Sequence, residues 1–140
     1  MLTSIAKIIE WDRIETAFRE VFNRRWYTNS GPLVRKVEKE LERYLNAKHV
    51  ICMTNYTIAK EIVREAGVED PSLRVISLYP SVSMIPGACV STDRDRTGTL
   101  LRNMRSSYGI DRQMDVPLTG NGRMSEAQAL MILLALEKSP

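Results

Sequence analysis

Apolar residues recur at helical spacing in the first third of the chain and predict two amphipathic helices. The first runs from Trp11 to Phe22, where every third or fourth residue is apolar. The second begins near Pro32 and extends to Leu45, with Lys, Glu and Arg on its opposite face. Because residues 27–32 include Asn, Ser, Gly and Pro, we expect a turn between the two helices.

Short apolar runs alternate with helical patterns in the middle of the chain. Three ranges have the length and composition of strands: 49–53, 75–79 and 88–91. A helix is predicted from Ile58 to Gly67, and another from Leu100 to Tyr108. Strand followed by turn and helix is typical of an α/β fold.

The last predicted helix is apolar on nearly every side. Ser125 and Gln128 form the pattern of a capping box, which places the start of this helix directly before residues 127–136. A helix without a polar face must be buried in a core or in an interface between chains.

Length and composition are those of a globular protein. The chain has 140 residues, of which 44% are hydrophobic and 26% charged, which predicts one domain and excludes disordered and collagen-like chains. The sequence shows neither a signal peptide nor an apolar stretch long enough to span a membrane, so we expect a cytoplasmic protein without a membrane partner.

The net charge of +3 raises the question of nucleic-acid binding. The excess of basic residues is spread over both halves of the chain, and its densest stretch, from Arg94 to Arg112, lacks the interleaved aromatics that stack on bases. This pattern supports nucleic-acid binding only weakly.

Cysteine and histidine usage argues against a metal site. Cys52 and Cys89 lie in apolar runs without paired metal-ligand spacing, and they are interpreted as buried hydrophobic residues of a reducing compartment. His49, the single histidine, has no neighbouring ligand set. We therefore predict no metal.

Two turns before helices could hold an anion. Asn55, Tyr56 and Thr57 lie where a strand runs into a helix, and free N–H groups at such a point can bind phosphate. Arg123 lies in the glycine-containing turn before the last helix. Helix capping without a ligand is the simpler interpretation of the first turn, and a loop with a cap is that of the second.

The same segments, in the same order, resemble the DegT/DnrJ/StrS family of sugar aminotransferases. Trp26–Pro32 is similar to the family's W-x-T-x-G-P loop, and Glu38, Leu41, Tyr44 and Leu45 to its E-x-x-L-x-x-Y-L helix. Residues 49–59 resemble the strand and S-G-T-x-A turn that bind the cofactor phosphate. This first block spans residues 1–67.

A second block, residues 75–140, continues the resemblance. Residues 77–81 are similar to the run that precedes the Schiff-base lysine, and 101–109 to an arginine-containing helix of the family. The segment from Asn121 to Ala129 matches N-x-R-M-S-E-x-Q-A, a specific signature.

The resemblance implies an α/β fold, a partial large domain of the aspartate-aminotransferase architecture with helices on a small, mostly parallel sheet. It implies pyridoxal phosphate as cofactor and a nucleotide-linked keto sugar as substrate. The implied cofactor-binding positions are Asn55, Tyr56, Thr57, Ser77 and Asn121, and the implied substrate positions are Tyr27, Thr28, Gly31 and Arg123. In the family the Asn121 position contacts the cofactor of a neighbouring subunit, which implies a homo-oligomer or association with a full-length homologue.

Several departures from the family pattern bear on catalysis. Val82 occupies the lysine position, so the chain has no catalytic residue there, and Tyr56 replaces a small residue in the phosphate turn. The family's long middle section is absent between Gly67 and Val75, and the resemblance ends near Leu136, before the family's small C-terminal domain.

Three hypotheses follow from these departures. The chain is a shortened, catalytically silent relative; or it is active when a partner chain or a local lysine such as Lys60 supplies the missing amine; or it is a basic binding module. We also expect unpaired strand edges and a last helix with little to bury it, and hence oligomerisation or marginal stability.

Overall fold

The computed structural model describes residues 9–28, 30–106, 115–117 and 120–138. The helices are α1 (Trp11–Arg24), α2 (Pro32–Leu45), α3 (Tyr56–Ala66), α4 (Asp95–Met104) and α5 (Glu126–Lys138), and the strands are β1 (His49–Met53), β2 (Arg74–Ser77) and β3 (Ala88–Thr92). The predicted elements are thus all present. None of the helices in the described ranges is both long and apolar enough to cross a membrane.

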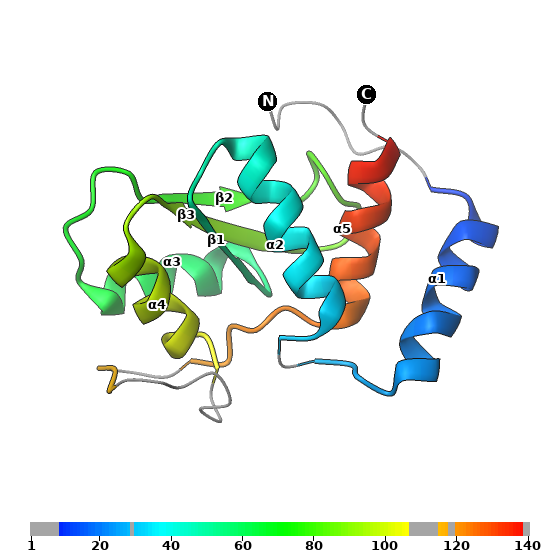
Figure 1. Ribbon diagram of the computed structural model, residues 1–140, viewed down its shortest axis with the longest axis horizontal. Helices are drawn as coiled ribbons and strands as arrows, with labels where there is room; N and C mark the ends of the chain where they lie inside the picture. The colour runs from blue at the N-terminus through cyan, green and yellow to red at the C-terminus, as the bar shows by residue number, and fades with distance from the viewer. Residues whose placement is uncertain (1–8, 29, 107–114, 118–119, 139–140) are drawn as a thin grey trace.

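The three strands form a sheet that is covered by helices on both faces (Figure 1). Alternate residues of each strand point to opposite faces. Val50 and Cys52 pack with α2 and α5 in one hydrophobic cluster, whereas Ile51 and Met53 pack with α3 and α4 in a second. Each cluster contains residues from both blocks of the sequence. Both faces of the sheet are buried, which explains why its strands are largely apolar.

The strand directions correct the expected mostly parallel sheet. The strand order is β1-β3-β2, and β3 is antiparallel to both of its neighbours. β1 and β2 run in the same direction because helix α3 carries the chain between them. β3 then enters between these two strands in the reverse direction, after the loop that follows Leu78.

Two further features differ from expectation: the burial of the last helix and one of the two sheet edges. Helix α5 is well buried within the chain: it lies between α2 and α1, and the residues Ala129, Leu130, Ile132 and Ala135 are at most 5% exposed (Figure 1). The outer edge of β1 is covered too, because side chains of α2 and α4 bind its backbone groups. The last helix and the outer edge of β1 are thus covered within the chain, whereas β2 forms the other edge of the sheet.

Element boundaries differ slightly from the sequence pattern. β2 ends at Ser77 rather than Tyr79, and α4 begins at Asp95, five residues before the first apolar residue of its pattern. The predicted continuation of α4 to Tyr108 lies outside the described residues. The capping box is confirmed, since Ser125 Oγ accepts the N–H of Gln128 and Gln128 Oε1 accepts the N–H of Ser125.

Asp70 closes the short connection between α3 and β2, where the resemblance places the family's long middle section. Its carboxylate accepts hydrogen bonds from the N–H and the hydroxyl of Ser72, at 2.9 and 2.7 Å, and from the hydroxyl of Thr92. Nearby, Arg94 donates to the carbonyl of Glu69 at 2.8 Å. The two blocks are therefore joined by a turn with its own hydrogen-bond network.

This carboxylate predicts an acid-dependent loss of stability. Burial raises the pKa of Asp70, but hydrogen bonds from Ser72, Thr92 and Thr97 outweigh burial and lower the pKa from 3.8 to about 2. Because the pKa is lower in the folded state, the carboxylate stabilises the fold above pH 3.8, and this contribution is lost as the pH falls towards 2. We expect the free energy of unfolding, measured with urea, to fall more steeply over this range for the wild type than for Asp70→Asn. Parallel pH profiles would contradict the assignment.

Candidate functional site

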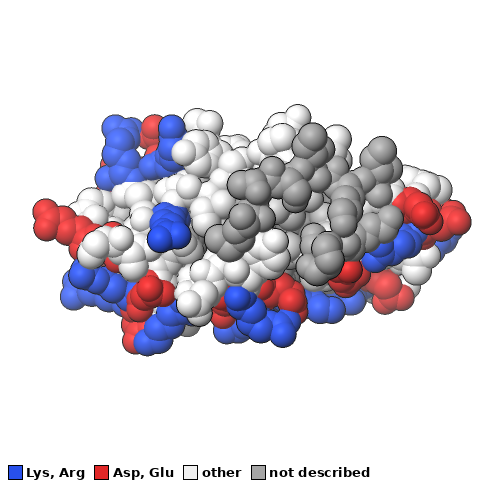
Figure 2. Space-filling view, turned by 90° about the horizontal axis from the view of Figure 1, so that it is seen from above, with Lys and Arg blue, Asp and Glu red and all other residues white. Residues whose placement is uncertain are grey.

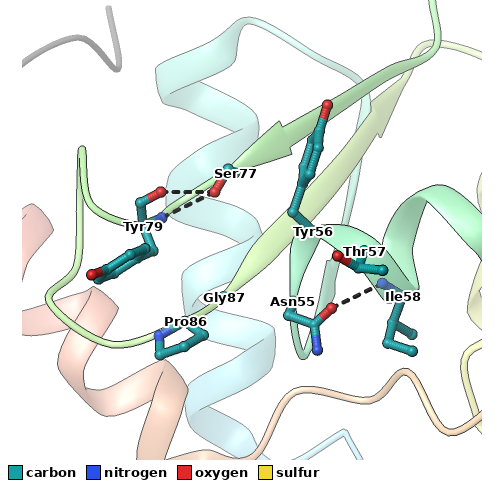
Figure 3. A pocket seen from close by; sticks show the side chains of 8 residues that line it. All are labelled: Asn55, Tyr56, Thr57, Ile58, Ser77, Tyr79, Pro86 and Gly87. Carbon is teal, nitrogen blue, oxygen red and sulfur yellow. Dashed lines mark hydrogen bonds between the residues drawn. The ribbon is translucent and has the colours of Figure 1, made fainter.

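A pocket of about 350 Å³ opens where α3 begins and β3 starts. Figure 3 shows its lining from two sides of the fold: Asn55, Tyr56, Thr57 and Ile58 around the start of α3, and Ser77, Tyr79, Pro86 and Gly87 around the loop that leads into β3. The structure thus brings together four residues that the resemblance implied for cofactor binding. None of the described lining residues carries a charge.

The start of α3 has the geometry of a capped helix. The Asn55 side chain accepts a hydrogen bond from the N–H of Ile58 at 2.9 Å, which makes Asn55 the N-cap (Figure 3). The predicted helix cap is therefore present at this turn. The first turn of α3 also carries the partial positive charge of a helix N-terminus towards the pocket.

Two tyrosines flank the pocket. Tyr56 extends from the start of α3, and Tyr79 lies across from it, with both side chains between two fifths and one half exposed (Figure 3). The hydroxyl of Ser77 donates to the carbonyl of Tyr79 at 2.8 Å, which orders this wall of the pocket. The ammonium of Lys60 lies 5.0 Å from the centre of the Tyr56 ring, a cation–π contact beside the pocket.

Val82 does not line this pocket. Its side chain is 7% exposed and belongs to the hydrophobic cluster between the sheet, α2 and α5, together with Leu78, Met124 and Ile132. The backbone N–H of Val82 bonds the carbonyl of Leu78 at 3.0 Å. The position that the resemblance assigns to the lysine is thus part of the core.

The Asn121–Arg123 segment runs beside the end of β1. The N–H of Thr54 donates to the carbonyl of Gly122 at 2.8 Å, and Arg123 forms a β-bridge with Met53. Asn121 is exposed and is not among the residues that line the pocket. The structure places Asn121 and Arg123 near the pocket's end of the sheet without bringing them into the pocket.

The three implied substrate residues of the first block lie near the start of α2. The carbonyl of Tyr27 accepts the N–H of Glu126 at 2.9 Å, and Thr28 follows in the same loop. Gly31 packs so closely against the Glu126 side chain that a Cβ at this position would collide with its carboxyl group. None of the three lines the pocket, and a structural contact accounts for the glycine.

Two side chains of the Asn121–Ala129 segment hold the parts of the site in place. The sequence pattern did not predict this role. Glu126 accepts the N–H groups of Leu33 and Val34 at 3.0 and 2.9 Å and so caps α2, whose own N-cap is glycine. Gln128 donates to the carbonyls of Thr54 and Pro86 at 2.8 and 2.9 Å. The amide of Gln128 thus ties together the two walls of the pocket.

A buried network of ion pairs connects α2 with α4, the two helices whose residues resemble family motifs. Glu38 on α2 accepts hydrogen bonds from Arg102 at 2.8 Å, from Arg105 at 2.6 Å and from the N–H of Cys52 at 2.8 Å. Arg105 also donates to the carbonyl of Cys52 and to the hydroxyl of Ser30. The Glu38 and Arg105 side chains are each 4% exposed. These motif residues therefore stabilise the fold at some distance from the pocket.

Some of the arginines of the basic-module hypothesis are engaged within the fold. Arg102 and Arg105 bind Glu38, Arg94 donates to a backbone carbonyl, and Arg112 lies outside the described residues. On the face shown in Figure 2, the basic and acidic side chains of the described residues are intermixed along the rim. The described residues on this face thus form no continuous positive stripe of the kind that a nucleic-acid backbone would need.

The part of the chain described here holds no cluster of residues suited to a metal ion. His49 lies 2.7 Å from Asp95, which also pairs with Lys48. The two cysteines are free and buried, as the sequence predicted.

Comparison with known proteins identifies the architecture. No curated protein matches the sequence significantly. Among solved structures, DesI in the presence of its TDP-sugar product aligns with a TM-score of 0.79 and 14% identity over 98% of this chain and 60% of that one. The structure of ntda from Bacillus subtilis with bound cofactor PMP aligns with a TM-score of 0.71 and 13% identity, over 90% of this chain and 52% of that one.

A third structure, a DegT DnrJ EryC1 StrS aminotransferase from Brucella abortus, aligns with a TM-score of 0.68 and 14% identity, over 90% of this chain and 63% of that one. The chain thus spans about three fifths of the length of the first of these structures. At such identities the similarity establishes the fold. The family model, in contrast, matches the sequence itself over residues 9–84, more than half of the chain. The chain belongs to the DegT/DnrJ/EryC1/StrS aminotransferase family.

Proposed function

We propose that this chain is a catalytically silent member of the family that keeps a ligand pocket but has lost the covalent chemistry of aminotransfer. The observation that carries the proposal is the position of Val82. Aminotransferases of this kind need a lysine amine that bonds to the cofactor and moves a proton. A valine packed in the hydrophobic core offers neither an amine nor a titratable group.

Pyridoxal phosphate is the cofactor that family membership implies, and the residues present do not fit its covalent attachment. The described residues that line the pocket include neither a lysine nor a carboxylate that could pair with the pyridine nitrogen. The pocket is therefore better suited to reversible binding.

Its geometry supports a ligand that combines a phosphate with a ring. The N-terminus of α3 favours an anionic group, and the Thr57 hydroxyl lies beside it. Tyr56 and Tyr79 offer two aromatic surfaces at the rim for a planar ring. A nucleotide-linked sugar contains both parts and is the substrate class that the resemblance implies.

A second candidate function rests on Lys60. Its ammonium is 5.0 Å from the Tyr56 ring, which places one amine next to the pocket although not within its lining. In this alternative Lys60, or a lysine supplied by a second copy or a full-length homologue, restores aminotransfer. The exposure of Asn121 is compatible with a contact to a neighbouring subunit.

Borohydride trapping distinguishes the two candidates. The protein is incubated with pyridoxal phosphate and reduced, and any lysine adduct is located by peptide mass spectrometry, with Lys60→Arg as the matched variant. If the chain is silent, the native protein forms no adduct at a single lysine beyond the scattered labelling of the denatured chain. A selective adduct at Lys60 that is lost in Lys60→Arg would reject the silent form and support the alternative.

Binding is measured separately, by titration calorimetry with a thymidine diphosphate sugar. We expect saturable binding that is weakened at least several-fold by Thr57→Val, because the hydroxyl beside the helix N-terminus is removed. The same titration after mixing with a full-length family member, together with a sizing measurement, tests the partner. Absence of saturable binding to the chain alone would refute the retained pocket.

A further inference from the structure

Cys52 and Cys89 lie directly opposite each other on adjacent strands. In the register of the antiparallel pair β1 and β3, the Cα atoms of these two residues are partners. Both side chains point into the cluster between the sheet, α2 and α5, and both residues are fully buried. The proposed function uses neither thiol.

The hydrogen bonds of Cys52 define the type of this pair. Its N–H donates to Glu38 at 2.8 Å, and its carbonyl accepts from Arg105 at 2.9 Å, so both backbone groups point away from β3. The carbonyl of Val50, two residues earlier, accepts from Arg102 on the same outer edge. In an antiparallel ladder, a residue whose N–H and C=O both point outward belongs to a non-hydrogen-bonded pair.

This type of pair has the closest backbone approach in an antiparallel sheet. Its Cα atoms are typically about 4.5 Å apart, and a disulfide spans Cα atoms separated by about 4.4–6.8 Å. Side chains of directly opposed residues also leave the sheet on the same face. We propose that Cys52 and Cys89 are a latent cross-strand disulfide site, which low-molecular-weight disulfides such as glutathione disulfide can oxidise.

The reaction is a pair of thiol–disulfide exchanges. The thiolate of one cysteine attacks glutathione disulfide, forming a mixed disulfide and releasing one glutathione thiolate. The second cysteine then attacks the protein sulfur of the mixed disulfide, which forms the Cys52–Cys89 bond and releases the second glutathione. Two protein thiols lose two electrons and two protons, and one glutathione disulfide is reduced to two glutathiones.

The environment of the thiols controls the rate of this reaction. Burial, followed by the charge of Glu38, raises the pKa of Cys89 to about 12 and that of Cys52 well above its usual value. Few thiolates therefore exist in the closed structure, and exchange requires local opening of β1, which is an edge strand. Oxidation should be slow in the native protein and faster during refolding.

The bond would join the two strands next to the pocket. Cys52 precedes the N-cap Asn55 by three residues, and Cys89 follows the lining residue Gly87 by two. A disulfide at this position would therefore link the chain segments that lead into both walls.

The test compares the folded and unfolded states of the same chain. The protein is equilibrated in glutathione redox buffers with and without denaturant, remaining thiols are alkylated, and the products are quantified by mass spectrometry. We expect a Cys52–Cys89 disulfide whose equilibrium constant of formation is at least about tenfold higher in the folded state, because the fold holds the partners together. Cys89→Ala, which retains Cys52, should give no intramolecular product.

An equal or lower equilibrium constant in the folded state would overturn the proposal. So would a native product consisting mainly of glutathione mixed disulfides or of cross-linked dimers. Because the main comparison uses the wild-type chain, it does not depend on whether the variant folds.

Discussion

Replacing Arg105 with methionine is expected to lower the free energy of unfolding by about 3–5 kcal/mol. The substitution keeps much of the side-chain volume but leaves the Glu38 carboxylate buried without its strongest partner. It also removes the donors that Arg105 gives to the carbonyl of Cys52 and the hydroxyl of Ser30. Since domains of this kind are stable by only about 5–15 kcal/mol, the loss should be obvious in urea denaturation.

An exposed ion pair offers the matched control. Arg43 pairs with Glu40 on the surface of α2, so Arg43→Met should cost less than about 1 kcal/mol. Changing Glu38 to leucine in the Arg105→Met background removes the buried carboxylate that has lost Arg105 and should restore part of the lost stability. If Arg105→Met costs no more than Arg43→Met, the network does not stabilise the fold as described.

Gly31→Ala is expected to lower the free energy of unfolding by about 2–4 kcal/mol. The new methyl group would occupy the position of the Glu126 carboxyl group. Glu126 would then have to leave the N–H groups of Leu33 and Val34, and α2 would lose its cap. Denaturant unfolding of the purified variants measures this effect.

A substitution at Gly67 serves as the control that distinguishes crowding of the new side chain from backbone strain. It has a φ of +60° and open space around its Cβ position, so Gly67→Ala should cost only about 1 kcal/mol. In a Glu126→Ala background the carboxyl group is already absent, and Gly31→Ala should there be close to neutral. A full, additive cost in that background would show that the Gly31 backbone, and not Glu126, requires glycine.

Local pattern was sufficient to identify the elements. Helical spacing placed α1 and α2, the short apolar run at 49–53 placed β1, and the pair Ser125 and Gln128 placed the start of α5. These signals depend on neighbours within a few residues, which the sequence contains directly. Strand direction has no such signal, since the position of β3 between β1 and β2 is decided by packing across the whole chain.

The candidate site was predictable only in part. Resemblance placed Asn55, Tyr56, Thr57 and Ser77 together, and the structure brings them to one pocket. Tyr79 and Pro86 were not expected there, although Tyr79 belongs to the motif that precedes position 82. The hydrogen-bonding roles of Glu126 and Gln128 could not be predicted, because their partners are backbone groups far away in the sequence.

The contacts of Glu126, Gln128, Glu38 and Arg105 also bear on how the family's motifs persist. Each of these side chains binds backbone or a buried partner that keeps the fold closed. Selection for a folded chain alone would retain them in a lineage that no longer transfers an amino group. These four motif positions therefore report on the architecture, whereas position 82 is the one to which the resemblance assigns the chemistry.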